Sequence, residues 1–313
     1  MSDARPSDYS TEVRVPASTS NLGAGFDCFG LALRLYLTVR AFAAPTSSAP
    51  CRVRSLPREE NSKLPRNTEN LIFRVMLRTA ERLGRELPPV RLAVRNEIPL
   101  GRGLGSSAAA AIAGVYLGAR LAGEGVSKEE VLRYATEIEG HPDNVAASLH
   151  GGWTIACTSG GGSVLALKKR WPAEVKVVAV SPHAELETKG ARALLSQTVS
   201  LADAVHNLQR AALFTAALEE RAYDLLWEAT RDRLHQEQRK YLVPGVAEAL
   251  STERMTGLLG LALSGAGPTV VALALGNFEE IGKRIAGCFE KHGVRTGVRL
   301  LEVDEEGAVE RRK

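Results

Sequence analysis

The amino-acid sequence predicts an α+β protein. Segments of alternating apolar and polar residues, typical of strands, are mixed with segments of helical periodicity, without the regular alternation of a doubly wound fold. The 313 residues suffice for two medium-sized domains, and 44% hydrophobic residues with 24% charged ones are ordinary for a globular protein. A glycine-rich segment at 158–163 suits either a linker or a hairpin, so we place domains at residues 1–165 and 166–313.

Local patterns in the first half predict strands at 11–18 and 90–99, and a strand or strand pair at 28–43. A helix is expected over 67–84, with Asn67 or Thr68 as its cap and Gly84 as its stop. An alanine-rich helix follows residue 105 and ends near Gly123. The next helix covers 127–140, and its Ser127 and Glu130 have the spacing of a capping box. Residues 141–152 lead into a strand that follows a glycine pair.

The second half opens with a strand at 175–182. Two long helices are expected at 200–221 and 223–242. Residues 258–275 are predicted to form a strand, a glycine turn and a second strand, before a helix at 278–293 and a final strand at 294–303.

Composition excludes several classes of function. The net charge of +4 is spread along the chain without basic stripes or aromatic platforms, so we expect no nucleic-acid partner. The four cysteines lack metal-binding spacing, and the first ten residues lack the apolar core of a signal peptide. No apolar run approaches the roughly 20 residues of a membrane helix, so no membrane partner is expected. These features favour a cytoplasmic protein with reduced thiols.

The segment "PLGRGLGSSAAAA" (99–111) lies between a predicted strand and a predicted helix. Gly101, Gly103 and Gly105 permit positive φ angles and close approach of a ligand to the backbone. Ser106 and Ser107 stand at the start of the helix, where free N–H groups and the helix dipole favour an anion. We therefore interpret the loop as a phosphate site, although such loops also serve as tight turns. It is neither a Walker A loop nor a GxGxxG fingerprint, because the required spacings are absent.

Two more glycine-rich segments accompany this loop. "NLGAGFD" contains Asn21 and Asp27, and "SGAGPT" contains Gly265 and Gly267, between two predicted strands. Taken alone, each of these two segments is equally typical of an ordinary turn without a ligand.

Together with "EGHPDNVAASLHGG", these segments occur in the order typical of the GHMP kinases, and the chain resembles the homoserine kinase family among them. The likeness extends from about residue 13 to the final strand. Ser18 and Asn144 stand where mevalonate kinase-like members usually carry a lysine and a catalytic aspartate.

The resemblance implies a two-domain α+β fold, with an N-terminal domain like ribosomal protein S5 domain 2 and a ferredoxin-like C-terminal domain. It implies ATP- and Mg²⁺-dependent phosphorylation of the side-chain hydroxyl of L-homoserine, a step toward threonine, in a cytoplasmic homodimer. Two alternatives stay open: another small-molecule GHMP kinase, of the mevalonate or shikimate type, and a non-catalytic regulator that binds ATP and a metabolite.

The resemblance also assigns residues at the nucleotide end. Ser107 and Glu139 would bind magnesium, with Ser106 and Glu137 as the alternatives. Gly265 and Gly267 would support the phosphate loop. The residues expected to contact ATP are Asn70, Pro99, Leu100, Gly101, Arg102, Gly103, Leu104, Gly105, Ser106, Ser107, Ala108 and Ala109.

At the substrate end, the resemblance implies that arginines bind the carboxylate and oxygen acceptors bind the ammonium group. Arg239 lies in "HQEQR", which departs from the family's usual Pro-Tyr before the arginine, so Arg233 is an alternative. The residues expected to contact the substrate are Asn21, Asp27, Asn144, Thr188, Arg192 and Arg239.

The motif "HPDN" also suggests His141 or Asp143 as a general base. The mechanism that the resemblance implies needs no general base from the protein, because the hydroxyl proton passes to the γ-phosphate. Catalysis would then rest on Asn144 and Glu139, with His141 as an orienting hydrogen-bond partner.

Overall fold

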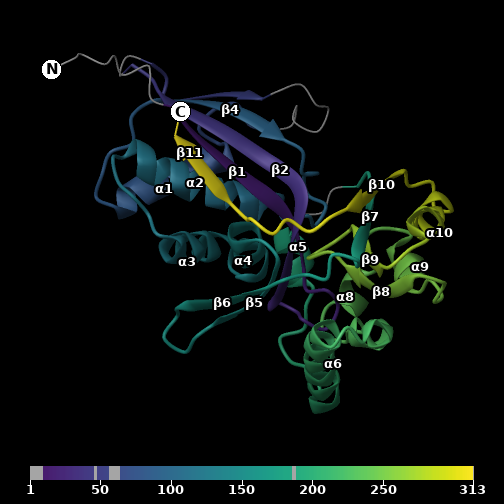
Figure 1. The fold of residues 1–313 in the computed structure, drawn as a ribbon. Helices are drawn as coiled ribbons and strands as arrows, with labels where there is room; N and C mark the ends of the chain where they lie inside the picture. The colour runs from purple at the N-terminus through teal and green to yellow at the C-terminus, as the bar shows by residue number, and fades with distance from the viewer. Residues whose placement is uncertain (1–9, 46–47, 56–63, 185–187, 313) are drawn as a thin grey trace.

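The computed structural model describes residues 10–45, 48–55, 64–184 and 188–312. Two β-sheets form two domains that lie side by side (Figure 1). This mixed two-domain architecture confirms the α+β prediction.

The larger sheet contains β1 (Ser10–Ser20), β2 (Phe29–Ala43), β3 (Cys51–Ser55), β4 (Val90–Asn96), β5 (Trp153–Thr158), β6 (Val164–Lys169) and β11 (Val309–Arg312). Its main order is β11-β1-β2-β4-β3, while β5 pairs with β2 and β6. All pairs are antiparallel except β3 with β4. Strand β2 is continuous across 29–43, and the 158–163 segment is a hairpin turn between β5 and β6.

Four helices cover one face of this sheet: α1 (Leu71–Arg82), α2 (Ser106–Leu121), α3 (Lys128–Glu139) and α4 (Asp143–His150) (Figure 1). Helix α2 is buried almost all round, because its small side chains pack on β1 while α1, α3 and α4 surround it. Its central position fixes the glycine loop that precedes it. The capping box of α3 forms as predicted between Ser127 and Glu130.

The second sheet contains β7 (Lys176–Pro182), β8 (Leu258–Leu263), β9 (Val270–Ala274) and β10 (Thr296–Leu301). Its antiparallel order is β10-β7-β9-β8, with helical segments after β7 and α10 (Phe278–Glu290) between β9 and β10. This is the ferredoxin-like arrangement that the resemblance implies. The other helices are α5 (Thr188–Ala193), α6 (Leu201–Glu219), η2 (Tyr223–Leu225), α7 (Leu226–Ala229), α8 (Gln236–Arg239) and α9 (Val246–Leu250).

The larger sheet includes segments on both sides of residue 165. That residue lies inside β6, which pairs with β5, and β11 returns beside β1 from the other end of the chain (Figure 1). We therefore propose a domain boundary between β6 and β7, with the last strand belonging to the first domain.

Three local predictions were wrong. Helix α1 begins at Leu71, because the Asn70 side chain accepts a hydrogen bond from the N–H of Ile72 and caps the helix there. The long helix expected at 223–242 is broken into short pieces. Residues 143–150, expected only to lead into a strand, form helix α4.

Asp232 accounts for the break in the expected long helix. Its carboxylate accepts hydrogen bonds from the N–H groups of Leu234, His235 and Gln236, and so replaces the helical carbonyl partners with a side chain.

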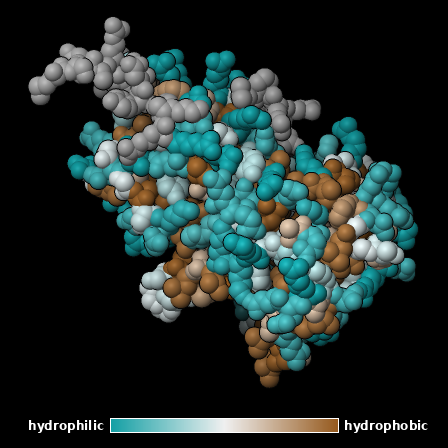
Figure 2. Space-filling view, viewed as in Figure 1, coloured by the Kyte–Doolittle hydropathy of each residue, from teal (hydrophilic) through white to brown (hydrophobic). Residues whose placement is uncertain are grey.

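The described residues contain no helix that is both long and apolar enough to cross a membrane. Figure 2 shows hydrophilic residues over most of one face, with hydrophobic ones in separate groups.

Candidate active site

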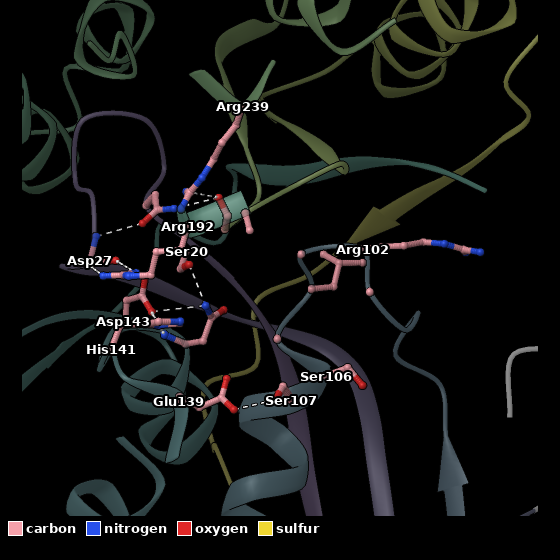
Figure 3. Close-up of a pocket in the computed structure, with 18 of the residues that line it drawn as sticks. Ser20, Asp27, Arg102, Ser106, Ser107, Glu139, His141, Asp143, Arg192 and Arg239 are labelled. Atoms are coloured by element: carbon pink, nitrogen blue, oxygen red, sulfur yellow. Dashed lines mark hydrogen bonds and ion pairs between the residues drawn. The ribbon is translucent and has the colours of Figure 1, made fainter. Parts of the chain in front are cut away.

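A cavity of about 480 Å³ lies where the two domains meet. Figure 3 shows the glycine loop with Ser106 and Ser107 at one end, Arg192 and Arg239 at the other, and Asp143 between them. The lining residues are Ser20, Asn21, Asp27, Pro99, Gly101, Arg102, Gly103, Leu104, Gly105, Ser106, Ser107, Glu139, His141, Asp143, Asn144, Arg192, Arg239, Gly265 and Ala266.

The glycine loop depends on backbone conformations that glycine adopts without strain. Gly101, Gly103 and Gly105 have φ angles of 62°, 75° and 71°. A Cβ atom on Gly103 would lie 2.1 Å from the carbonyl oxygen of Ser264, in the turn between β8 and β9. The Ser264 hydroxyl donates a 2.6 Å hydrogen bond to the Gly103 carbonyl. The "SGAGPT" turn therefore packs directly on the loop.

The loop ends at the N-terminus of α2. Gly105 occupies the N-cap position and provides no side-chain cap, so the first N–H groups of the helix remain available to an anion. Ala108 and Ala109 are buried in the helix and do not line the cavity, and neither does Leu100. The loop therefore presents mainly backbone to the cavity.

Ser107 and Glu139 bring two hard oxygen atoms together beside the loop. The Ser107 hydroxyl donates a 2.6 Å hydrogen bond to Glu139 Oε1 (Figure 3). Burial raises the pKa of the Glu139 carboxyl, and the Ser107 hydrogen bond partly offsets that effect. Glu137, the alternative ligand, instead forms an ion pair with Arg82 away from the cavity.

Asn144 lies in a network of buried serine hydroxyls. Its Oδ1 accepts a 2.9 Å hydrogen bond from Ser18, and its Nδ2 donates one of 2.8 Å to Ser20. Ser148 donates in turn to the Ser18 hydroxyl at 3.0 Å. These contacts join β1 to α4 and fix the Asn144 amide at the cavity wall.

His141 and Asp143 form a buried pair, with 2.7 Å between Nδ1 and Oδ1. Burial alone would raise the pKa of the Asp143 carboxyl, but the hydrogen bond and charge of His141 outweigh it and hold that pKa below its ordinary value. Burial would likewise lower the pKa of His141, but Asp143 raises it above its ordinary value. The pair is therefore favoured in its charged form, and the carboxylate is a weak base.

Two arginines form the opposite end of the cavity. The Arg192 guanidinium pairs with both carboxylate oxygens of Asp27, with 3.1 Å between Nη1 and Oδ1. Arg239 is 3% exposed, and its Nη1 donates 3.3 Å hydrogen bonds to the Gly265 carbonyl and to His235 Nδ1. Burial lowers the pKa of Arg239 from its very high ordinary value. Within the described part of the chain, Nη2 of Arg239 has no hydrogen-bond partner.

The remaining predicted residues differ in position. Asn21 lines the cavity, but its side chain is engaged with the Gly265 carbonyl and the Asp27 N–H. Arg233, the alternative to Arg239, lies outside the cavity beside Asp203. Asn70 is a helix cap away from this cavity.

Thr188 is the first residue of α5, and its side chain lies outside the described part of the structure. Gly267 lies in the supporting turn, where a Cβ would meet the Leu263 side chain at 2.8 Å. Arg102 points away from the Arg192 and Arg239 end in Figure 3.

Sequence reasoning did not single out Ser20, Phe26 or His235 as site residues. Phe26 lies within "NLGAGFD", and its ring stacks on His235 with centroids 5.1 Å apart. The guanidinium carbons of Arg192 and Arg239 lie 5.6 and 5.5 Å from the centre of the same ring. Phe26 could have been predicted as a site residue, because it lies inside the motif "NLGAGFD". No motif pointed to His235, which only the fold brings to the site.

The donor set fits magnesium and a polyphosphate. Magnesium takes one or two hard protein oxygens and completes its shell with water and phosphate, and Ser107 and Glu139 provide such a pair. The described residues contain no cluster of three or more histidine, cysteine or acidic side chains able to hold a metal by themselves. A metal held by Ser107 and Glu139 would take its remaining ligands from phosphate and water.

Comparisons with known proteins agree with this geometry. Residues 70–152 match the GHMP kinases N terminal domain, and residues 204–291 match the GHMP kinases C terminal family. A homoserine kinase of Desulfitobacterium hafniense is 41% identical over 95% of this chain and 98% of its own length. One of Aquifex aeolicus is 39% identical with the same coverage.

The crystal structure of homoserine kinase from Cytophaga hutchinsonii superposes with a TM-score of 0.82, at 27% identity, over 99% of both chains. Likeness in sequence and in fold thus extends over both domains. The chain belongs to the homoserine kinase family of the GHMP kinases.

Proposed function

We propose that this protein transfers the γ-phosphoryl group of ATP to the side-chain hydroxyl of L-homoserine, with magnesium. The observation that carries the proposal is the composition of the cavity's two ends. One end offers backbone N–H groups and the Ser107–Glu139 oxygen pair, and the other offers two arginines and a carboxylate. An anionic phosphate chain and a small zwitterion match these two ends, and phosphoryl transfer between them requires mainly positioning and charge neutralisation.

At the nucleotide end, the loop N–H groups and the start of α2 bind phosphate oxygens. Ser107 and Glu139 hold the metal ion, which when bound neutralises charge on the phosphates. Because Glu139 is partly buried and its pKa is raised, a nearby cation would favour its charged, ligating form.

At the centre, Asn144 is a fixed amide whose partners are serine hydroxyls. Its role is to hold the substrate hydroxyl in line with the phosphoryl group. Asp143 is an unsuitable base, because its carboxylate already accepts hydrogen bonds from His141 and the Asn144 N–H and its pKa is lowered. The hydroxyl proton accordingly passes to the transferred phosphoryl group.

The Asp27–Arg192 ion pair forms a template for a zwitterion. A substrate that carries both an ammonium group and a carboxylate can place each opposite the member of opposite charge, so neither is left unpaired. Nη2 of Arg239 provides a further donor for the carboxylate.

The decisive experiment is a substrate panel. Purified protein with MgATP should release ADP when L-homoserine is supplied, and phosphorus NMR should identify the O-phosphate ester. Mevalonate, shikimate and galactose, at equal concentration, should give only background. Turnover with one of these and none with homoserine would overturn the assignment, and partner binding without any turnover would favour a regulator.

We also propose, from the family resemblance, that the protein is a cytoplasmic homodimer acting in threonine synthesis. Leu201, Val205 and Leu208 expose apolar surface along one face of α6, which a second copy could cover. Light scattering on purified protein measures the oligomeric state directly.

A further inference from the structure

His235 occupies an unusual place beside the cavity. It is fully buried, between the Gly23 carbonyl on one side and the Arg239 guanidinium on the other. The distances are 3.0 Å from Nε2 to the Gly23 oxygen and 3.3 Å from Nδ1 to Nη1 of Arg239. A carbonyl oxygen only accepts hydrogen bonds and a guanidinium only donates them. One protonation state satisfies both: the neutral imidazole with its hydrogen on Nε2.

The surroundings fix this side chain in place. Asp232 binds the backbone N–H of His235, and Asn207 donates a 2.7 Å hydrogen bond to the same carboxylate. Phe26 stacks on the imidazole with an interplanar angle of 22°. The ring therefore has little freedom to rotate, and its acceptor nitrogen stays directed at Arg239.

We propose that His235 is a positioning residue that holds the Arg239 guanidinium for the substrate carboxylate, by accepting its hydrogen bond as the neutral Nε2–H imidazole. The inference rests on the proposed function for the identity of the substrate. It goes beyond that function by assigning a role to a residue outside the cavity lining.

The charges around His235 agree with this tautomer. The groups that face it are Asp232, with Oδ1 3.7 Å from Nε2, Arg239, and more distantly Asp27. Burial lowers the pKa of His235; the charge of Asp232 opposes burial with a smaller effect, and the charge of Arg239 lowers the pKa further. A protonated imidazole would also bring a second cation against Arg239 and release its hydrogen bond.

Two substitutions separate the two hydrogen bonds. In His235→Asn, the amide oxygen can take the place of Nδ1 and accept from Arg239, whereas the contact with Gly23 is lost. In His235→Gln, the amide reaches the level of Nε2 and can donate to Gly23, but no acceptor remains beside Arg239. His292→Gln, at an exposed site on the C-terminal domain, is the matched control.

We expect His235→Gln to raise the KM for L-homoserine about fivefold, with the KM for ATP unchanged, since a hydrogen bond to a charged group is lost. His235→Asn should stay near the wild-type value, as should His292→Gln. Equal effects of Asn and Gln, or a parallel rise in the KM for ATP, would overturn the proposal, because a purely structural role predicts them.

Nitrogen NMR of histidine-labelled protein provides a readout that needs no turnover. The imidazole signals absent from His235→Asn should show the neutral Nε2–H form at about pH 7 in the wild type. An Nδ1–H or cationic ring at that pH would overturn the proposal. If the wild type fails to phosphorylate homoserine, the proposed function fails, while the tautomer measurement still decides the state of His235.

Discussion

The two ends of the cavity are built in different ways. The nucleotide end consists mainly of one continuous loop whose backbone conformation is set by its own glycines. The substrate end is assembled from side chains on separate segments: Asp27 before β2, Arg192 on α5 and Arg239 on α8. A continuous backbone site tolerates side-chain changes and is sensitive to added atoms. A site made of side chains depends on each hydrogen-bonding group, and substitutions at the two ends should therefore change different kinetic constants.

Gly103→Ala should have the largest effect. The new methyl group would collide with the Ser264 carbonyl, and the φ of 75° is unfavourable for alanine. We expect kcat/KM for ATP to fall about a hundredfold or more, because a displacement of about 1 Å at a reacting group costs that much in rate. Gly123→Ala is the control, since Gly123 also has a positive φ but nothing lies within 4 Å. It should cost about 1 kcal/mol of stability and leave turnover intact. Similar kinetics for both variants would contradict the proposed packing.

Glu139→Gln should raise the magnesium concentration needed for half-maximal activity by about 50-fold, because a neutral amide is a poorer ligand than a carboxylate. Glu137→Gln removes a carboxylate from the ion pair with Arg82 and should leave the magnesium titration unchanged. If Glu137→Gln has the larger effect, the metal ligand is misassigned.

Arg239→Lys tests the opposite end. The charge is kept, but the planar fork that serves His235 and Gly265 is lost, so the KM for L-homoserine should rise about 30-fold at an unchanged KM for ATP. Arg233→Lys, outside the cavity, should match the wild type. A rise in the KM for ATP instead would show that the two ends are not separable.

Asp143→Asn should have the smallest effect, about fivefold or less in kcat, since the amide oxygen can still accept from the Asn144 N–H. The acid side of the pH–kcat profile should not change shape, because a carboxylate with a lowered pKa does not act as the base. An inactive Asp143→Asn protein that still folds, as judged by circular dichroism, would restore Asp143 as the base.

The same contrast explains what the sequence could predict. The glycine loop, the Ser127 capping box and most strands follow from neighbouring residues, and each is found where it was expected. The break of the 223–242 helix was not predicted, because Asp232 competes for backbone N–H groups through a side chain that periodicity does not consider. His235 likewise gains its partners Gly23 and Phe26 only through tertiary folding.

The choices between Glu139 and Glu137, and between Arg239 and Arg233, show the same limit. Each pair is close in sequence, yet only one member of each lines the cavity. The rotation of a helix about its axis and its packing against the rest of the protein decide which side chain faces the cavity. The residue type, which is the same within each pair, determines neither of them. The catalytic assignments themselves remain predictions for the experiments above.

The position of β11 has a consequence for synthesis on the ribosome. Its partner β1 precedes the other strands of the described residues and β11 follows them, so that edge of β1 stays unpaired until β11 emerges. The ferredoxin-like domain, encoded between them, can form before the first sheet is complete. The nascent chain therefore acquires its nucleotide loop before the sheet that supports this loop is closed by β11.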